Sequence, residues 1–325
     1  MKRQVIATAL AGLLALSACS SSGGKKAEEQ QSKAVTGGGP RIKIAMVTHS
    51  APGDAFWDIV QKGAQAASAK DNVQFLYAAD PDGGKQAQLV QSYIDQHVDG
   101  IIVTLAKPDA LKDVVTKAVQ AKIPVMTINS GADVSAKLGT LAHFGQDESI
   151  AGEAAGEQLN KAGIKKAVCL IHEQGNVGLE ARCAGAKKTF TGQLDNLFVQ
   201  GANMPQVKSA VTAKLQADKG IDGILALNAQ ISLTASDATK ESGGKAKVGT
   251  FDMNKDLIAA IKDGRIQFAV DQQPYLQGYE AIDGVWLYER NGDILGGGQP
   301  VLTGPAVVDK TNADAVAPYA ERGTR

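Results

Sequence analysis

Short apolar segments alternate with segments of helix length along most of this 325-residue chain. In the first half, the apolar segments lie at 42–47, 73–77, 100–104 and 124–128, with helix-length segments at 55–69, 84–96 and 108–121. Strands that are apolar throughout, rather than at every second residue, are typical of parallel sheets covered on both faces. The alternation therefore predicts an α/β fold with doubly wound, Rossmann-like parallel sheets.

The alternation begins again in the second half. Apolar segments lie at 167–171, 197–200, 223–226, 247–251 and 267–270, with helix-length segments at 179–190, 207–217, 231–241 and 275–287, and a last extended segment at 301–308. The phrase Asp99-Gly100-Ile101-Ile102-Val103 has a counterpart in Asp222-Gly223-Ile224-Leu225-Ala226, where each Asp-Gly turn leads into a buried strand. Because the region from 41 to 325 also exceeds the usual size of one core, we expect two similar lobes.

The N-terminus has the pattern of an export signal. Lys2 and Arg3 precede an uncharged apolar run at 5–16, which is shorter than the roughly 20 residues of a spanning helix. The end of the run, Leu16-Ser17-Ala18-Cys19, resembles the bacterial lipobox, in which the cysteine is diacylated and becomes the mature N-terminus. We expect a signal peptide at 1–18 and lipidation at Cys19, with a plain secretory signal as the alternative.

The polar segment that follows Cys19 lacks a periodic apolar pattern. Residues 19–40 are rich in Ser, Gly, Lys, Glu and Gln, so they are expected to form a flexible tether. Together, signal, cysteine and tether predict a protein held by lipid at the extracytoplasmic side of the cell membrane. No basic patch indicates nucleic-acid binding.

The motifs of common enzyme classes are missing from the sequence. The glycines at 296–298 are not followed by Gly-Lys-Ser/Thr, and there is no Gly-x-Ser-x-Gly. The four histidines His49, His97, His143 and His172 lack the close pairing of a metal motif. We therefore predict no enzyme activity, no metal site and no cofactor.

Planar polar side chains and aromatic rings follow several of the predicted strands. Sugar hydroxyls are both donors and acceptors, which suits Asp, Asn, Gln and Arg, and the apolar faces of a sugar suit aromatic rings. Two adjacent aromatics, Phe56 and Trp57, cannot both face the core of one helix, which favours at least one in a cleft. The candidate ligand-binding residues are Asp54, Phe56, Trp57, Asn129, Gln146, Glu173, Arg182, Asn228, Phe251, Asp252 and Gln272.

These residues and their order resemble the type I periplasmic sugar-binding proteins of the ribose and galactose class. The resemblance spans about 43–308 and implies two lobes joined by three hinge strands near Gln146, Gln272 and Leu302. The implied lobes are 41–146 with 273–301, and 147–272 with 302–325. It also implies a monomer that closes on a ligand between the lobes and delivers it to the permease of an ABC transporter, with Asp252 as the strongest candidate contact.

One position departs from that resemblance. Many relatives carry Asp-Arg after the fourth strand, where this chain has Asn129-Ser130. The amide still suits a pair of hydroxyls, but the neighbouring cation is missing. Within the expected ligand class, a monosaccharide or short polyol, this departure favours a smaller or more flexible polyol.

Other functions for the same fold stay open or are excluded. A sugar-responsive repressor would need a helix-turn-helix before Arg41, where this chain has the signal and tether. A receptor that presents its ligand to a membrane sensor, and a binder of a non-sugar small polar ligand, remain alternatives.

Two cysteines remain besides Cys19. Cys169 lies in the first strand of the second lobe, and Cys183 lies near the start of the helix that follows. The export signal indicates a compartment that permits disulfides, so we expect a Cys169–Cys183 bond, with two buried thiols as the alternative.

Overall fold

The computed structural model describes residues 40–325. The predicted signal peptide at 1–18, Cys19 and the predicted tether up to residue 39 lie outside the described residues. None of the helices within residues 40–325 has the length and apolarity that crossing a membrane requires.

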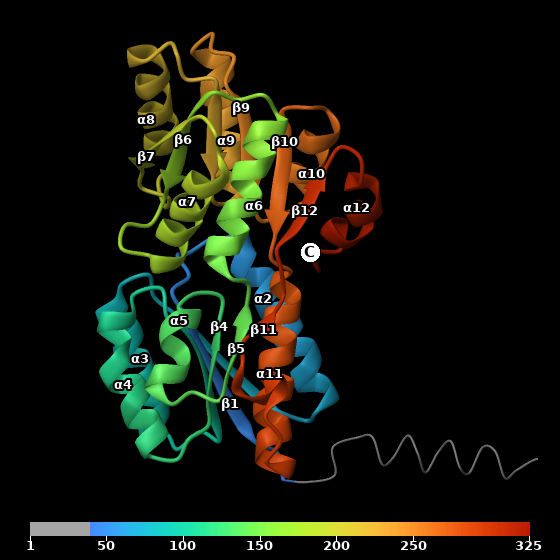
Figure 1. The fold of residues 1–325 in the computed structure, drawn as a ribbon. Coiled ribbons are helices and arrows are strands. Elements are labelled where there is room, and N and C mark those ends of the chain that lie inside the picture. The colour runs from blue at the N-terminus through green and yellow to red at the C-terminus, as the bar shows by residue number, and fades with distance from the viewer. Residues whose placement is uncertain (1–39) are drawn as a thin grey trace, which may run out of the picture. The chain divides into compact units, whose positions relative to one another are not determined.

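The first sheet has six strands in the order β11-β5-β4-β3-β1-β2, and all its neighbouring strands are parallel (Figure 1). Its strands are β1 (Lys43–Thr48), β2 (Gln74–Ala79), β3 (Gly100–Thr104), β4 (Val125–Ile128), β5 (Ala142–Gly145) and β11 (Val301–Leu302). One face packs against α2 (Ala55–Lys70) and α11 (Pro274–Asn291), and the other against α3 (Gly83–Asp95) and α4 (Pro108–Gln120). Each face of the sheet carries a cluster of buried apolar side chains. Alternate residues of β1 belong to the two clusters, Ile44 and Met46 to one and Ala45 and Val47 to the other, which explains why the strand is apolar throughout.

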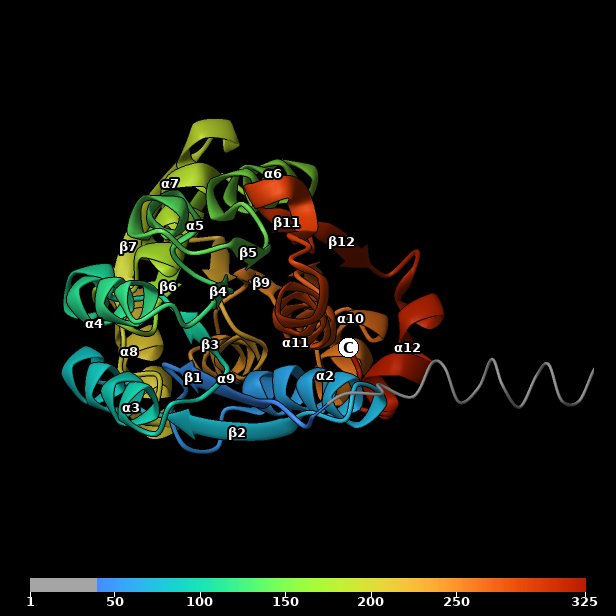
Figure 2. The ribbon, with the colours of Figure 1, turned by 90° about the horizontal axis from the view of Figure 1, so that it is seen from below.

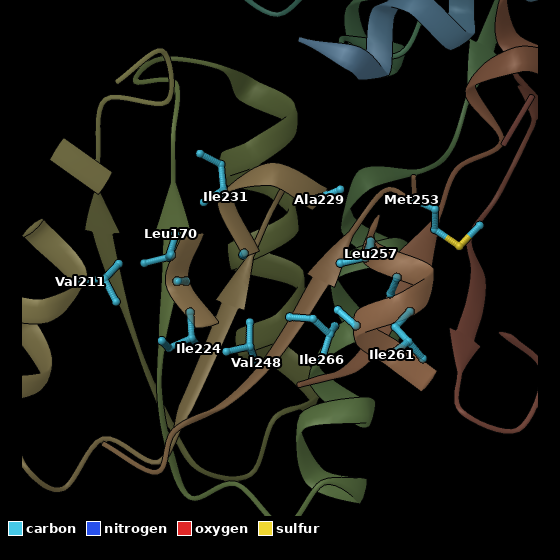
Figure 3. Close-up of a cluster of buried hydrophobic side chains, with 14 of the residues drawn as sticks. Leu170, Val211, Ile224, Ala229, Ile231, Val248, Met253, Leu257, Ile261 and Ile266 are labelled. Carbon is cyan, nitrogen blue, oxygen red and sulfur yellow. The ribbon is translucent and has the colours of Figure 1, made fainter. Parts of the chain in front are cut away.

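The second sheet repeats this order as β12-β10-β9-β8-β6-β7. Its strands are β6 (Lys166–Ile171), β7 (Gln193–Phe198), β8 (Gly223–Ala226), β9 (Lys247–Phe251), β10 (Ile266–Asp271) and β12 (Ala306–Asp309), the last of which is antiparallel to β10. The helices α6 (Glu148–Lys161) and α7 (Val177–Thr189) pack on one face, and α8 (Met204–Ala217), α9 (Ala229–Glu241), α10 (Lys255–Lys262) and α12 (Ala313–Glu321) contribute to the cluster on the other. Figure 3 shows this second cluster, which extends from Leu170 and Val211 at one end, through Ile224 and Val248, to Leu257 and Ile261 of α10 at the other.

The repeated Asp-Gly phrase has the same structural role in both lobes. Asp99 Oδ2 accepts a hydrogen bond from the backbone N–H of Lys43 at 2.6 Å, at the start of β1. Asp222 Oδ1 accepts one from the backbone N–H of Lys166 at 2.8 Å, at the start of β6. Each aspartate therefore satisfies a backbone donor at the start of the neighbouring strand, and the predicted pair of similar doubly wound lobes is confirmed.

Strand β7 covers Gln193–Phe198, whereas the apolar pattern predicted a strand at 197–200. It lies at the edge of the second sheet and pairs only with β6, from Lys166 opposite Gln193 to Ile171 opposite Phe198. An edge strand needs few apolar side chains, so its polar first half was not recognised as a strand.

Helix α6 was not predicted because its buried face is made of small residues. Ala151, Gly152, Ala155 and Gly156 lie on this face, and they lack the large apolar side chains by which a buried helix face is recognised. The extended segment predicted at 301–308 is two strands, β11 in the first sheet and β12 in the second.

The chain passes between the two sheets three times. It leaves β5 for α6, leaves β10 for α11, and leaves β11 for β12. Leu302 still pairs with Gly145 in the first sheet, so the last passage begins after Leu302.

Each lobe contains a pair of helices whose backbones are in contact at glycines, α2 with α11 in the first lobe and α6 with α7 in the second. The end-on view in Figure 2 shows α2 beside α11. A Cβ atom on Gly278 of α11 would lie 2.0 Å from the carbonyl oxygen of Val60 in α2. In the second lobe, a Cβ atom on Gly185 of α7 would lie 2.1 Å from the carbonyl oxygen of Ser149 in α6. These glycines set the helix spacing, and α7 carries part of the site described below.

We predict that Gly278→Ala destabilises the protein. The added methyl group meets backbone that cannot move without separating α2 from α11, so the free energy of unfolding should fall by about 2 kcal/mol or more. Urea denaturation measures the change. Gly284→Ala on the same helix is the control, because its Cβ would meet only side-chain atoms, the nearest being Phe144 Cζ at 3.0 Å. An equal effect of the two substitutions would contradict the close backbone contact.

Candidate ligand-binding site between the lobes

A cavity of about 600 Å³ lies between the carboxyl ends of the two sheets. Its wall contains nine of the eleven candidate residues: Asp54, Phe56, Trp57, Asn129, Glu173, Arg182, Asn228, Asp252 and Gln272. The other two, Gln146 and Phe251, lie behind the wall. Gln146 donates to Glu148, the carboxylate that holds Arg182, and the ring of Phe251 packs against Arg182 itself. The topology explains the clustering, since parallel strands of each sheet end at the same edge.

The first loop brings a carboxyl group and two aromatic rings to the cavity. Asp54 caps α2, its Oδ1 accepting from the backbone N–H of Phe56 at 3.1 Å. Burial raises the pKa of Asp54, although hydrogen bonds from Phe56 and Asn228 oppose the shift. Phe56 and Trp57 both belong to the apolar core and both line the cavity, with ring centroids 5.0 Å apart. The expectation that only one could face the core was wrong, because the first turn of α2 borders the core and the cavity at once.

Asn129 and Asp252 occupy equivalent places in the two lobes. Each follows its strand directly, and each has a left-handed backbone, with φ of 65° and 63°. The backbone N–H of Asn129 donates to Phe144 O, and that of Asp252 donates to Val270 O, both at 3.0 Å. Asn and Asp tolerate this conformation better than other residues with a Cβ, which accounts for their type at these strand ends.

The side-chain amide of Gln272 connects these two residues. Asn129 Nδ2 donates to Gln272 Oε1 at 3.0 Å, and Gln272 Nε2 donates to Asp252 Oδ1 at 2.6 Å. Gln277 Nε2 also donates to Gln272 Oε1 at 3.0 Å, so the orientation of the amide is determined. Among the described residues, no hydrogen bond reaches Asp252 Oδ2, which leaves this oxygen for a ligand in the cavity.

Arg182 projects from α7 and is held from outside the cavity. It donates to Glu148 from Nε at 2.6 Å and from Nη2 at 2.8 Å, and Gln146 Nε2 donates to the same carboxylate at 2.8 Å. The guanidinium carbon lies 4.7 Å from the centroid of the Phe251 ring. Burial opposes the charge, but attraction to Glu148 and its hydrogen bonds outweigh burial and raise the pKa of Arg182 above its ordinary value.

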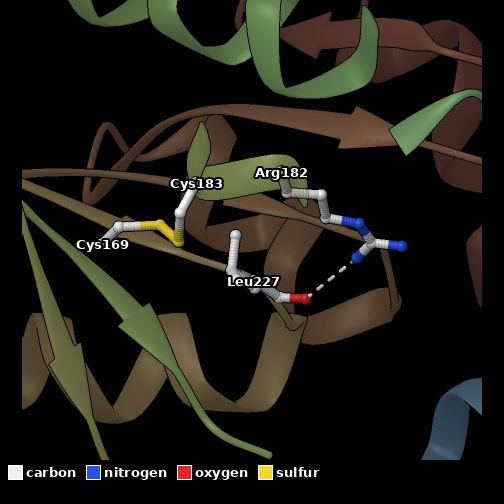
Figure 4. The surroundings of a disulfide bond; sticks show 4 residues. All are labelled: Cys169, Arg182, Cys183 and Leu227. Atoms are coloured by element: carbon white, nitrogen blue, oxygen red, sulfur yellow. Dashed lines mark hydrogen bonds between the residues drawn. A yellow bond between two sulfur atoms is a disulfide. The ribbon is translucent and has the colours of Figure 1, made fainter. Parts of the chain in front are cut away.

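The predicted disulfide is present beside this arginine. Cys169 in β6 is bonded to Cys183 in α7, with Cα atoms 6.0 Å apart. Cys183 follows Arg182 in the chain, and Figure 4 shows Arg182 Nη1 directed to the carbonyl oxygen of Leu227, at 3.4 Å. The disulfide thus ties the helix that carries Arg182 to the central part of the second sheet.

Several wall residues were not among the candidates, notably His49, Ser130, His172 and Asn176. His49 follows β1 directly and Ser130 follows Asn129, so the rule that site residues follow strand ends could have found both. Burial lowers the pKa of His49, and it lowers the pKa of His172 to about 4, so both rings are neutral at pH 7. Asn176 caps α7 and gave no separate signal in the sequence.

Contacts between the lobes lie beside the cavity. His49 Nε2 of the first lobe lies 3.3 Å from Asn176 Nδ2 of the second. Lys107 Nζ of the first lobe lies 3.3 Å from Glu173 Oε1 of the second, whose Oε2 accepts from Asn176 Nδ2 at 2.9 Å. These polar pairs join the lobes with the cavity enclosed between them.

Comparisons with known proteins agree with this geometry. Residues 44–291 match the family model described as periplasmic binding protein domain. The chain is 31% identical over 205 residues to the fructose import binding protein of Bifidobacterium longum, covering 59% of this chain and 62% of that protein, and so less than two thirds of its length. It is 28% identical over 235 residues to the ribose import binding protein of Bacillus subtilis, covering 70% of this chain and 75% of that protein.

Solved structures extend the comparison to nearly the whole described region. A carbohydrate transporter from Acidothermus cellulolyticus, in complex with myo-inositol, matches with a TM-score of 0.87 and 50% identity, covering 88% of this chain and 100% of that chain. A solute-binding protein from Burkholderia graminis, in complex with D-arabinose, matches with a TM-score of 0.75 and 27% identity, covering 83% of this chain and 96% of that chain.

A polar cavity between two doubly wound lobes, walled by amides, carboxyl groups and aromatic rings, defines a solute-binding protein of the kind that serves ABC transporters. The chain belongs to the periplasmic binding protein family, in the type I sugar-binding class. It is a sugar- or polyol-binding component rather than an enzyme.

We predict that the ionisation of Asp252 makes stability depend on pH. Burial raises the pKa of Asp252 to about 7, against the attraction of Arg182 and the hydrogen bond from Gln272. A raised pKa favours folding while the carboxyl group is protonated, so this contribution is complete below about pH 4 and is lost as the pH rises through about 7.

Urea denaturation without ligand, in the wild type and in Asp252→Asn, measures this effect. The free energy of unfolding of the wild type, relative to the variant that does not titrate there, should fall by on the order of 4 kcal/mol between pH about 4 and about 8. A constant difference across this range would show that Asp252 has an ordinary pKa.

Proposed function

We propose that this chain captures a neutral cyclic polyol or monosaccharide, with myo-inositol as the first candidate, and delivers it to the permease of an ABC importer. The observation that carries the proposal is the composition of the cavity wall. It combines side chains that can pair with hydroxyl groups with two aromatic rings. The match at 50% identity to a carbohydrate transporter solved with myo-inositol supports this choice of ligand.

The wall suits a ligand with hydroxyl groups around a compact apolar ring. Asp54 and Asp252 accept hydrogen bonds, Arg182 donates them, and Asn228 does both, so hydroxyls facing either lobe find partners. Trp57 lines the cavity, where its apolar ring can contact the carbon skeleton of a ligand. Ser130 stands where many sugar-binding relatives have arginine, and it favours a ligand that needs no cation on this side.

Binding and release require the lobes to separate. We propose that they move as the two bodies expected from the sequence, 41–146 with 273–301 and 147–272 with 302–325, hinged near Gln146, Gln272 and Leu302. The His49–Asn176 and Lys107–Glu173 pairs would then stabilise the closed arrangement.

We predict that wild-type protein binds myo-inositol and that Asp252→Ala weakens this binding at least tenfold without unfolding the protein. A charge-assisted hydrogen bond contributes roughly 1.5–3 kcal/mol, and the Asp252 carboxylate has a free oxygen at the cavity. Isothermal titration calorimetry measures the affinity, and circular dichroism checks the fold.

A thermal-shift screen of sugars and polyols accompanies the titration. Stabilisation by nucleosides or other non-sugars, with no effect of any sugar or polyol, would refute the proposed ligand class. An unchanged affinity in Asp252→Ala would remove this residue from the site.

We further propose that Cys19 carries a lipid that holds the protein at the extracytoplasmic face of the cell membrane. The support is the sequence Leu16-Ser17-Ala18-Cys19 at the end of an apolar segment, followed by a polar tether. The tether would let the lobes open and close beside a membrane permease.

We predict that Cys19→Ser releases the protein from the membrane. Cell fractionation should recover the wild type with the membranes and the variant in the soluble exported fraction, because a free serine hydroxyl cannot take the thioether-linked lipid. Mass spectrometry of the wild-type N-terminus should show an acylated cysteine. An unmodified N-terminus would contradict the proposal.

A further inference from the structure

The charge of Arg182 is already matched by a residue that does not line the cavity. Glu148 is the first residue of α6 and is buried, with 8% of its surface exposed. Both of its carboxylate oxygens accept from Arg182, Oε2 from Nε at 2.6 Å and Oε1 from Nη2 at 2.8 Å. This two-point geometry is the one that a guanidinium also uses to bind a carboxylate or phosphate ligand.

Few donors of Arg182 remain for a ligand. A guanidinium has five N–H groups, of which two face Glu148 and one faces Leu227 O at 3.4 Å. The remaining two can donate to hydroxyl oxygens. The two-point edge formed by Nε and Nη2 is occupied by the protein's own carboxylate, so an anion bound to the remaining donors would share Arg182 with Glu148.

No other lysine or arginine of the described residues offers a positive charge to the cavity wall. Lys107 lies behind Glu173, where its Nζ is 3.3 Å from Glu173 Oε1 and donates to Pro81 O at 2.7 Å. Three carboxyl groups, those of Asp54, Glu173 and Asp252, line the wall. An anionic ligand would therefore find no unpaired positive charge among the described residues of the wall, and it would be repelled by Asp252 whenever that carboxyl group is ionised.

We propose that Glu148 determines the charge class of the ligand: by pairing with Arg182 it makes the site accept uncharged polyols and reject anionic ones. The inference rests on the proposed function, since it concerns the selectivity of the same cavity. Glu148 is a positioning residue, because it acts on the ligand only through Arg182.

The physical reason is the burial of Arg182, of which only 3% is exposed. A buried guanidinium without a partner attracts an anion strongly, whereas one already paired with a carboxylate has little net charge to offer. Selectivity against a competitor is commonly achieved by such an unfavourable charge rather than by added contacts to the preferred ligand.

The test compares an uncharged and an anionic ring polyol in Glu148→Gln. Calorimetry, or competition where binding is weak, gives the dissociation constants of myo-inositol and of quinate, a tetrahydroxycyclohexane carboxylate. The wild type should bind myo-inositol at least a hundredfold more tightly than quinate. In E148Q this ratio should fall at least tenfold, because Arg182 regains a charge that can pair with the carboxylate.

The control is Glu153→Gln on the same helix. Glu153 Oε1 pairs with Lys188 Nζ of α7 at 3.0 Å on the solvent side, so this variant removes an equivalent charge between the same two helices without touching Arg182. E153Q should keep the wild-type ratio. A merely structural role of Glu148 would weaken both ligands equally in E148Q and leave the ratio unchanged, which would overturn the proposal.

Circular dichroism and thermal unfolding verify that E148Q is folded, because Arg182 loses a buried partner there. If E148Q does not fold, Glu148→Asp replaces it. The shorter carboxylate cannot hold Nε and Nη2 of Arg182 equally well, so the preference for myo-inositol over quinate should fall at least threefold. An unchanged preference overturns the proposal. Quinate binding by wild type within tenfold of myo-inositol also overturns it. If wild type binds neither myo-inositol nor any other uncharged sugar or polyol, the proposed function itself fails.

Discussion

The side-chain amide of Gln272 accepts a hydrogen bond from Asn129 in one lobe and donates one to Asp252 in the other. Gln272 follows β10 directly, at one of the three places where the chain passes between the sheets. A single side chain at this crossing between the sheets therefore orients the equivalent strand-end residues of both lobes. This arrangement depends on the parallel sheets, which bring the carboxyl ends of their strands to the cavity.

The interior of this molecule is apolar within each lobe and polar between them. Each lobe has an apolar cluster on either face of its sheet, while hydrogen bonds link the buried Asn129, Gln272 and Asp252 of the site, and likewise Arg182 and Glu148. Pairing is required because a buried polar group without a partner costs free energy. Arg182 shows the principle in full: Glu148, Leu227 O and the ring of Phe251 hold it from behind, and its remaining donors face the cavity.

The two lobes have similar folds but contribute different chemical groups to the site. Asp99 and Asp222 secure the starts of equivalent strands, and Asn129 and Asp252 end equivalent strands with the same left-handed backbone. An amide in one lobe and a carboxyl group in the other make these ends chemically different. The arginine and its carboxylate occur in the second lobe, whereas the aromatic pair Phe56 and Trp57 belongs to the first.

The sequence by itself determined the class of fold and nine residues of the cavity wall. Unbroken apolar strands separated by helix-length segments specify parallel sheets, and residues just after such strands must reach one edge, which favoured Asn129 and Asp252. Asp54, further along its loop, was predicted from the family resemblance. Only the tertiary structure showed that Gln146 and Phe251 stand behind the wall, and that Glu148 neutralises Arg182. These contacts join residues that are far apart in the chain or on different helices. The periodicity of apolar residues does not show which charged groups face each other. The polar edge strand β7 and the small-residue helix α6 were missed for a related reason: their stability comes from pairing and close backbone contact, not from a run of large apolar side chains.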